Sequence, residues 1–172
     1  MNNKNPLKTK NGKEDLKYTF PIVGIGCSAG SLNPLERFFK HLPDKPGMSF
    51  VIVKHMDPTY RTELDNILAK KTPLKVKFIK DKEKLTENIV YIVPPGKNAR
   101  LKEGKVYLKE PENPKGQRLP IDNFFRSLGK ELENKSIGVL LSGTGTDGTL
   151  GLREIKGRGG IAIVQDPEEA EY

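Results

Sequence analysis

Cysteine, tryptophan and long apolar stretches are scarce or missing in this chain of 172 residues, which has one cysteine and no tryptophan. A single cysteine excludes an internal disulfide framework and a metal site built from several cysteines. No apolar stretch approaches the roughly 20 residues that span a membrane, and no signal-peptide pattern is present. The sequence therefore predicts a cytoplasmic protein without membrane insertion. It offers no convincing cluster of metal ligands, so we expect no metal and no other cofactor.

Aromatic residues are also few, at 7% of the chain, although 30 Lys and Arg outnumber 22 Asp and Glu and give a net charge of +8. Most of the surplus lies in residues 61–118, which hold 15 basic and 8 acidic side chains. Proteins that bind nucleic acids more often combine clustered arginine with stacking aromatic side chains. We therefore expect no nucleic-acid partner. The lysine-rich middle is interpreted either as a solvated face or as a surface that attracts an acidic protein.

Residues 1–18 are polar and aperiodic, which predicts a disordered leader before a single domain over residues 19–172. In the domain, short β-branched runs alternate with amphipathic patterns. They predict strands at 22–26, 50–53, 76–79, 89–93, 137–141 and 161–164, helices starting near 34, 64, 121 and 147, and a hairpin over 99–109. This alternation predicts an α/β fold: a doubly wound, mostly parallel sheet with helices on both faces and a β-hairpin insertion.

A glycine-rich segment follows the first predicted strand at residues 24–30, Gly-Ile-Gly-Cys-Ser-Ala-Gly. Read as G-x-G-x-x-A, it is typical of a dinucleotide-binding turn. Read as G-x-S-x-G, it presents Ser28 on a tight strand-to-helix turn, as a nucleophilic serine requires. The nucleotide interpretation needs an acid at the end of the second strand, but Lys54 and His55 stand there and Asp57 comes later. The nucleophile is therefore favoured, and a glycine-rich turn without a catalytic role is its alternative.

Only two histidines could serve as the general base of a nucleophilic serine. His41 is expected as a solvated residue at the end of an amphipathic helix, whereas His55 follows the second predicted strand. The carboxyl ends of parallel strands share one edge of a sheet, so we expect His55 and Ser28 on the same edge. Cys27 is a weaker candidate nucleophile, because a single cysteine is usually buried and inert.

Another glycine-rich segment, residues 141–148 (Leu-Ser-Gly-Thr-Gly-Thr-Asp-Gly), follows a buried strand and places Asp147 at a strand-to-helix turn. A carboxylate there can orient the imidazole and stabilise its cation. The alternatives are that Asp147 caps the following helix, or that the glycines hold a phosphate. The predicted triad of Ser28, His55 and Asp147 does not follow the common α/β-hydrolase order, in which the histidine comes last.

These segments, together with residues 54–56 (Lys-His-Met), 91–96 (Tyr-Ile-Val-Pro-Pro-Gly) and 165–168 (Gln-Asp-Pro-Glu), resemble the catalytic domain of bacterial chemotaxis protein-glutamate methylesterases. The resemblance covers residues 21–172. At residues 35–39 and 148–152 the sequence is more similar to members fused to a methyltransferase. The family continues beyond the point where this chain stops, so we expect a domain truncated at its C-terminus.

The resemblance implies Ser28 as nucleophile, His55 as general base and Asp147 as the orienting carboxylate. It also implies that backbone N–H groups around Ala29, Thr144 and Gly145 line an oxyanion hole. Threonine is usual in the family at position 29 and methionine at position 144, but a backbone role needs no particular side chain.

The function implied by the resemblance is hydrolysis of glutamate methyl esters with release of methanol, and glutamine deamidation is a further activity to test. The implied protein substrate is the cytoplasmic domain of a methyl-accepting chemoreceptor. The implied partner is a methyltransferase domain, fused or associated, outside this chain. Two alternatives stay open: an α/β domain that binds a phosphate or nucleotide, and an inactive methylesterase-like interaction module.

Overall fold

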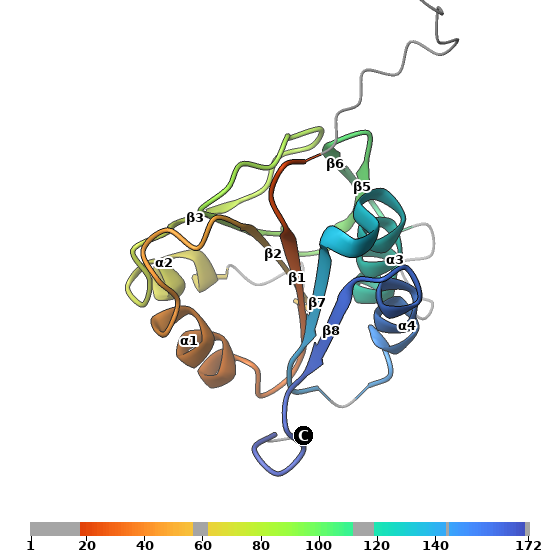
Figure 1. Ribbon diagram of the computed structural model, residues 1–172. Helices are drawn as coiled ribbons and strands as arrows, with labels where there is room; N and C mark the ends of the chain where they lie inside the picture. Colours follow the sequence, from red (N-terminus) through yellow and green to blue (C-terminus); the bar gives the residue numbers. More distant parts are fainter. Residues whose placement is uncertain (1–17, 57–61, 112–118, 144, 171–172) are drawn as a thin grey trace, which may run out of the picture.

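The computed structural model of the chain describes residues 18–56, 62–111, 119–143 and 145–170. Six strands form one sheet in the order β3-β4-β2-β1-β7-β8, and every neighbouring pair in it is parallel. They are β1 (Ile22–Cys27), β2 (Ser49–Lys54), β3 (Lys75–Phe78), β4 (Ile89–Ile92), β7 (Ser136–Leu140) and β8 (Ile161–Val164). This sheet, with helices between its strands, confirms the predicted α/β class (Figure 1).

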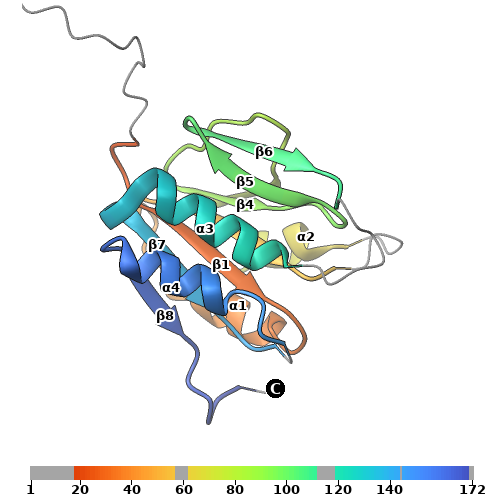
Figure 2. The ribbon, with the colours of Figure 1, turned by 90° about the vertical axis from the view of Figure 1, so that its right-hand side faces the viewer.

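Helices cover both faces of the sheet, as predicted. On one face lie α1 (Leu32–Lys40) and α2 (Leu64–Ala69), and on the other lie α3 (Pro120–Leu132) and α4 (Thr149–Gly157), which face the viewer in Figure 2. A short 3-10 turn, η1 (Glu133–Lys135), leads from α3 into β7. Each helix forms where apolar residues recur every three to four positions, so that one side of it can be buried against the sheet.

The core consists of two apolar layers, one on each side of the sheet. Phe39 of α1 and Leu68 of α2 pack with Phe50 and Ile52 in the first layer, and Phe125 of α3 packs in the second. The buried β-branched strands explain how a chain with only 35% hydrophobic residues makes an ordinary α/β core.

The helix α3 lies close to β1 because two glycines of that strand face it. A Cβ atom at Gly24 would come within 3.0 Å of Phe125 and Leu128, and one at Gly26 would collide with Ile121. The spacing of these glycines therefore brings the first turn of α3 against the carboxyl end of β1.

The predicted hairpin is also present as β5 (Asn98–Lys102) and β6 (Lys105–Lys109), with Glu103 and Gly104 at left-handed backbone angles in its turn. Tyr18, the last residue of the predicted polar leader, packs with the folded domain. Tyr18 is 4% exposed, and its hydroxyl donates a hydrogen bond to the Gly104 carbonyl at 2.6 Å. An aromatic residue beside a polar segment can be recruited by a hairpin that is distant in sequence, which composition alone does not reveal.

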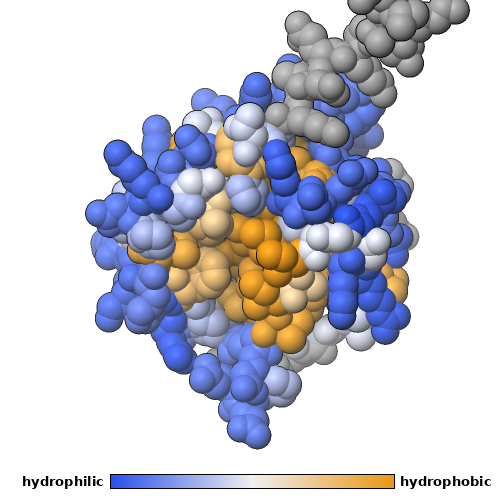
Figure 3. Space-filling model, viewed as in Figure 1, coloured by the Kyte–Doolittle hydropathy of each residue, from blue (hydrophilic) through white to orange (hydrophobic). Residues whose placement is uncertain are grey.

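The last strand, β8, forms an edge of the sheet. Ile161, Ile163 and Val164 in it are 52%, 47% and 63% exposed, and Figure 3 shows apolar side chains gathered between α1 and β8. Among the residues that the structure describes, no helix has both the length and the apolar character needed to cross a membrane.

Candidate active site

The order of the strands brings the three predicted site residues to one edge of the sheet. Strand β1 lies between β2 and β7, with Cys27 opposite Lys54 and Gly26 opposite Leu140. Ser28, His55 and the segment that carries Asp147 therefore leave the sheet side by side at its carboxyl edge. This is where ligands bind in open parallel sheets.

The backbone of Ser28 is fixed from both neighbouring strands. Its N–H donates to the Ser142 carbonyl at 3.1 Å, and its carbonyl accepts from the Ser31 hydroxyl at 2.6 Å and from Lys54 Nζ at 2.7 Å. Lys54 Nζ also donates to Ser31 Oγ at 2.8 Å. Lys54 thus holds the turn that carries Ser28, a role that the sequence analysis missed. The parallel pairing of β1 with β2 places it there, directly before His55.

Gly143 lies against Ser28 from the other side. A Cβ atom at position 143 would stand 2.8 Å from Ser28 Cβ, a separation that real Cβ atoms do not adopt. The glycine lets the loop after β7 approach the serine, so the two glycine-rich segments found in the sequence meet in space.

His55 and Asp147 form a hydrogen bond of 2.7 Å between Nε2 and Oδ2. A carboxylate can only accept, so Nε2 carries the proton and Nδ1 of the neutral ring is left as an acceptor. The His55 side chain is 37% exposed and Asp147 is 5% exposed. The acid is therefore buried beneath an imidazole that still reaches solvent.

Two further donors hold the Asp147 carboxylate. The Ile121 N–H donates to Oδ2 at 3.0 Å and the Asp122 N–H donates to Oδ1 at 2.8 Å. Both N–H groups belong to the first turn of α3, where unpaired N–H groups and the helix dipole favour a negative charge. Asp147 thus caps α3 and not the following helix α4, which was the alternative considered from the sequence.

Ser28, His55 and Asp147 line one small depression of about 120 Å³. Its other lining residues are Cys27, Ile121, Leu140, Leu141, Ser142, Gly143 and Gly145. A second depression of about 310 Å³ shares His55 with it and is lined also by Lys54 and Lys97. In the part of the chain that the structure describes, no hydrogen bond joins the Ser28 hydroxyl to His55. Catalytic hydrogen bonds are often loose until a substrate binds.

Cys27 differs from its neighbour Ser28 in both position and chemistry. Its side chain is 1% exposed and packs in the core layer with Leu35 and Phe39 of α1. Burial raises the pKa of its thiol to about 11, although the nearby Lys54 charge and a hydrogen bond with Ser31 act in the opposite direction. A thiol nucleophile reacts as the thiolate, so this cysteine is unsuited to that role near neutral pH.

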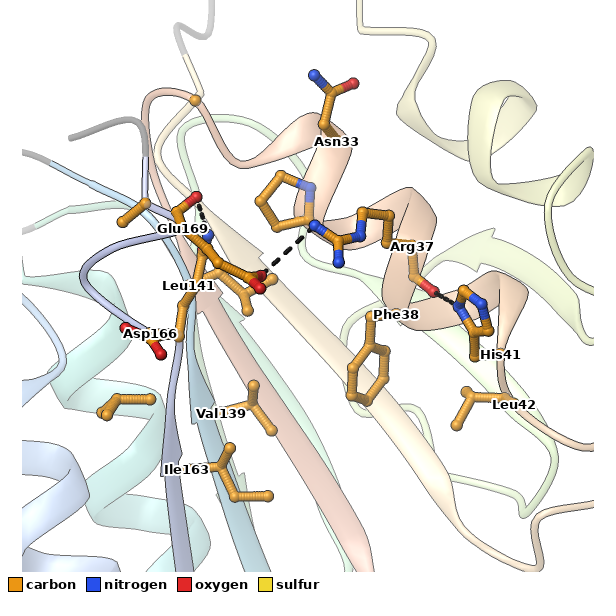
Figure 4. Close-up of a pocket in the computed structure, with 15 residues that line it drawn as sticks. Asn33, Arg37, Phe38, His41, Leu42, Val139, Leu141, Ile163, Asp166 and Glu169 are labelled. Carbon is orange, nitrogen blue, oxygen red and sulfur yellow. Dashed lines mark hydrogen bonds and ion pairs between the residues drawn. The ribbon is translucent and has the colours of Figure 1, made fainter.

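The other histidine lies elsewhere. His41 follows the C-terminal end of α1, is exposed, and its Nδ1 donates to the Arg37 carbonyl at 2.7 Å. Figure 4 shows it beside a groove between α1 and strands β7 and β8, which an ion pair of 3.5 Å between Arg37 and Glu169 crosses. A helix of nine residues separates it from the Ser28 turn, as the sequence analysis expected.

Two residues considered in the sequence analysis, Thr144 and Asp57, lie outside the described ranges. Within the described ranges, no group of three or more His, Cys, Asp or Glu side chains is arranged to hold a metal ion.

The fold and the edge that carries these residues define an α/β domain with its functional loops at the carboxyl ends of β1, β2 and β7. The family model described as CheB methylesterase matches residues 23–172. The chain therefore belongs to the CheB methylesterase family, a family of hydrolases.

Similar proteins agree with this assignment. The chain is 35% identical over 153 residues to a putative protein-glutamate methylesterase/protein-glutamine glutaminase of Leptospira interrogans, covering 88% of this chain and 79% of that protein. It is 32% identical to the protein-glutamate methylesterase/protein-glutamine glutaminase of Bacillus subtilis, but spans only 43% of that longer protein. The crystal structure of the Thermotoga maritima CheB methylesterase catalytic domain matches with a TM-score of 0.80 and 30% identity, over 90% of this chain and 84% of that one.

Proposed function

We propose that this protein removes methyl groups from glutamate methyl esters of chemoreceptors by a Ser-His-Asp mechanism. The observation that carries the proposal is the 2.7 Å hydrogen bond between His55 and Asp147, beside Ser28 in one depression at the carboxyl edge of the sheet. The names of the relatives support the substrate, since several are protein-glutamate methylesterases. The cytoplasmic location predicted from the sequence stays a prediction.

In the proposed reaction, Ser28 Oγ attacks the carbonyl carbon of the ester while His55 Nδ1 takes the hydroxyl proton. Asp147 holds the ring through Nε2–H and stabilises the imidazolium that forms. The tetrahedral intermediate collapses, the C–O bond to the methoxy group breaks, and methanol leaves with the proton from His55. Water then attacks the acyl-enzyme with the same base, which returns Ser28 and releases the glutamate side chain.

Backbone N–H groups are proposed to bind the oxyanion of the intermediate. Ala29 directly follows Ser28 in its turn, and Gly145 belongs to the loop that contributes Gly143 and Asp147 to the same depression. Thr144 was predicted with them and lies outside the described residues. Donors fixed by a folded loop stabilise the developing charge without reorganisation, which is the usual advantage of an oxyanion hole.

A glutaminase activity is proposed by the same mechanism. The relatives' names include protein-glutamine glutaminase, and attack of Ser28 on a glutamine amide would release ammonia in place of methanol.

The expected methyltransferase partner remains a proposal. A 104.1 kDa uncharacterised protein of Rhodobacter capsulatus contains a segment 36% identical to 107 residues of this chain, which covers 11% of that protein. Domains of this kind thus also occur within much longer chains.

The nucleotide-binding alternative receives less support. It needs an acid at the end of β2, whereas Lys54 stands there, and its ammonium donates to the Ser28 carbonyl and the Ser31 hydroxyl in the turn that follows β1.

Substitution of Ser28 tests the proposal. Ser28→Ala should abolish methanol release from a methylated receptor fragment and labelling by a fluorophosphonate, because loss of a catalytic serine costs about six orders of magnitude in a well-studied serine protease. Cys27→Ala is the matched control at the adjacent position and should keep both activity and labelling. Full turnover by Ser28→Ala would overturn the mechanism. Loss of turnover and labelling with Cys27→Ala alone would make the cysteine the nucleophile.

A further inference from the structure

A second buried carboxylate lies next to Asp147. Asp122, the third residue of α3, is 4% exposed. Its Oδ1 accepts hydrogen bonds from the Gly148 N–H at 3.0 Å and from the Gly151 N–H at 2.6 Å. A buried carboxylate is costly unless such donors satisfy it, and the start of a helix leaves N–H groups without partners. Asp122 and the beginning of α4 therefore satisfy one another.

The two aspartates cap each other's helices. Asp147 precedes α4 but accepts from Ile121 and Asp122 at the start of α3, whereas Asp122 lies in α3 but accepts from the start of α4. Each negative charge thus lies at the positive end of the other element's helix, which makes two adjacent buried carboxylates tolerable. This crossed arrangement joins the first turns of α3 and α4 at the edge of the sheet.

The backbone on both sides of Asp147 is rich in glycine. It lies between glycines at 145 and 148, and Gly148 has a φ of +101°, a conformation that L side chains rarely adopt. A Cβ atom at Gly148 would come within 2.8 Å of both Ile121 and Leu140, so the chain packs tightly as it turns into α4. The hydrogen bond from Gly148 to Asp122 fixes the position of the peptide that directly follows Asp147.

We propose that Asp122 is a positioning residue for the catalytic base, an inference that rests on the proposed Ser-His-Asp mechanism. Asp122 does not line the depression that holds Ser28 and His55. It acts through Gly148, because its side chain holds the start of α4 against α3 and so keeps the Asp147 oxygens in line with the α3 N–H groups and His55 Nε2. Its carbonyl-type oxygen is needed for this role, and its negative charge is not.

Substitutions at Asp122 separate the role of its acceptor oxygen from that of its negative charge. Asp122→Asn keeps an oxygen that can accept from both Gly148 and Gly151, so it should retain most of kcat. Asp122→Ala removes the acceptor and should lower kcat for a methyl ester by at least about tenfold, equivalent to about 1.4 kcal/mol in the transition state, with KM unchanged. Asp122→Ser, whose hydroxyl is short but can cap a helix, should give an intermediate kcat and serves if the alanine variant does not fold.

The ring N–H signals of the histidines supply a readout that does not depend on turnover. The chain has two histidines, so the proton that His55 shares with Asp147 can be assigned by NMR of the full chain, with the exposed His41 as an internal reference. Asp122→Ala should broaden or abolish the His55 signal and leave that of His41 unchanged, while Asp122→Asn keeps both. Leu132→Ala, at the other end of α3 and 7% exposed, is the control for loss of stability and should keep the His55 signal.

The proposal is overturned if Asp122→Ala, at the same stability as Leu132→Ala, keeps the His55 signal and has the same kcat as Leu132→Ala. It is also overturned if Asp122→Asn loses as much as Asp122→Ala, because the charge would then be the essential feature. If Ser28→Ala proves fully active, the proposed function fails, and the His55 signal in the Asp122 variants still decides whether Asp122 positions the Asp147–His55 pair.

Discussion

Replacing Asp147 with asparagine removes one acceptor oxygen from a carboxylate that accepts three hydrogen bonds. Oδ2 accepts from the Ile121 N–H at 3.0 Å and His55 Nε2 at 2.7 Å, and Oδ1 accepts from the Asp122 N–H at 2.8 Å. An amide has one oxygen and one NH₂ group, so it cannot satisfy both sides. In either orientation, one buried N–H at the start of α3 faces another donor.

The two orientations have different consequences for His55. If the amide oxygen replaces Oδ2, the ring keeps its tautomer and loses only the charge that stabilises the imidazolium. If the NH₂ group replaces Oδ2, it donates to Nε2, so the ring proton moves to Nδ1 and the base for Ser28 is lost. Loss of a hydrogen bond to a charged group corresponds to about 10- to 100-fold in rate, and a reversed tautomer costs about 10⁴-fold in a serine protease triad.

We therefore expect Asp147→Asn to lower kcat for methanol release by at least about tenfold and up to about 10⁴-fold. The free energy of unfolding should fall by about 1 to 3 kcal/mol, because one buried N–H loses its acceptor. Asp166→Asn, an exposed aspartate whose Oδ1 accepts from the Glu168 N–H, is the control and should leave kcat unchanged. A kcat within about threefold of the native value, together with the expected loss of stability, would show that Asp147 caps α3 without assisting His55.

Two other predictions concern the serine turn and the alkaline limit of stability. Gly143→Ala should lower kcat, because its methyl group would stand 2.8 Å from Ser28 Cβ, whereas Gly157→Ala, with nothing within 4 Å, should not; equal kcat values would refute the contact. Burial raises the pKa of Tyr18 to about 12, above the value of about 10 in the unfolded chain. The contribution of the buried neutral Tyr18 to the free energy of unfolding is therefore complete below pH 10. It is lost as the pH rises to 12, by about 3 kcal/mol at most. The free energy of unfolding in urea should therefore fall less between pH 9 and pH 11 in Tyr18→Phe than in the native chain. An equal fall in both proteins would contradict the prediction.

The placement of the three candidate site residues at one edge of the sheet could be predicted because it depends on local sequence patterns. A β-branched run followed by glycine defines the end of a buried strand, and parallel strands place such ends together. Ser28 follows a run of this kind, His55 follows the β-branched run at 50–53, which ends without a glycine, and Asp147 lies in the glycine-rich loop after the run at 137–141. Their arrival at one edge therefore required no knowledge of the tertiary structure. The structure bears this out in the strand order β2-β1-β7.

The partners of the acids could not be predicted in the same way. A capping rule assigns an aspartate before a helix to that helix, and on this rule Asp147 would cap α4. The structure places Gly148 at that position and directs Asp147 to α3, 25 residues earlier in the chain. Long-range hydrogen bonds of this kind leave no periodic trace in the sequence. The same applies to the Tyr18 hydroxyl, which bonds to a carbonyl 86 residues away.

The site nevertheless depends on small features that the sequence displays openly. Gly24 and Gly26 let α3 approach β1, and this approach brings the first N–H groups of α3 to the carboxyl edge. Those N–H groups donate hydrogen bonds to the Asp147 carboxylate, which in turn accepts a hydrogen bond from the ring of His55. The glycines that first suggested a nucleotide-binding turn thus contribute by their lack of side chains. A methyl group at Gly26 would collide with Ile121 and move the helix start, so the same substitution would disturb the core and the catalytic acid together.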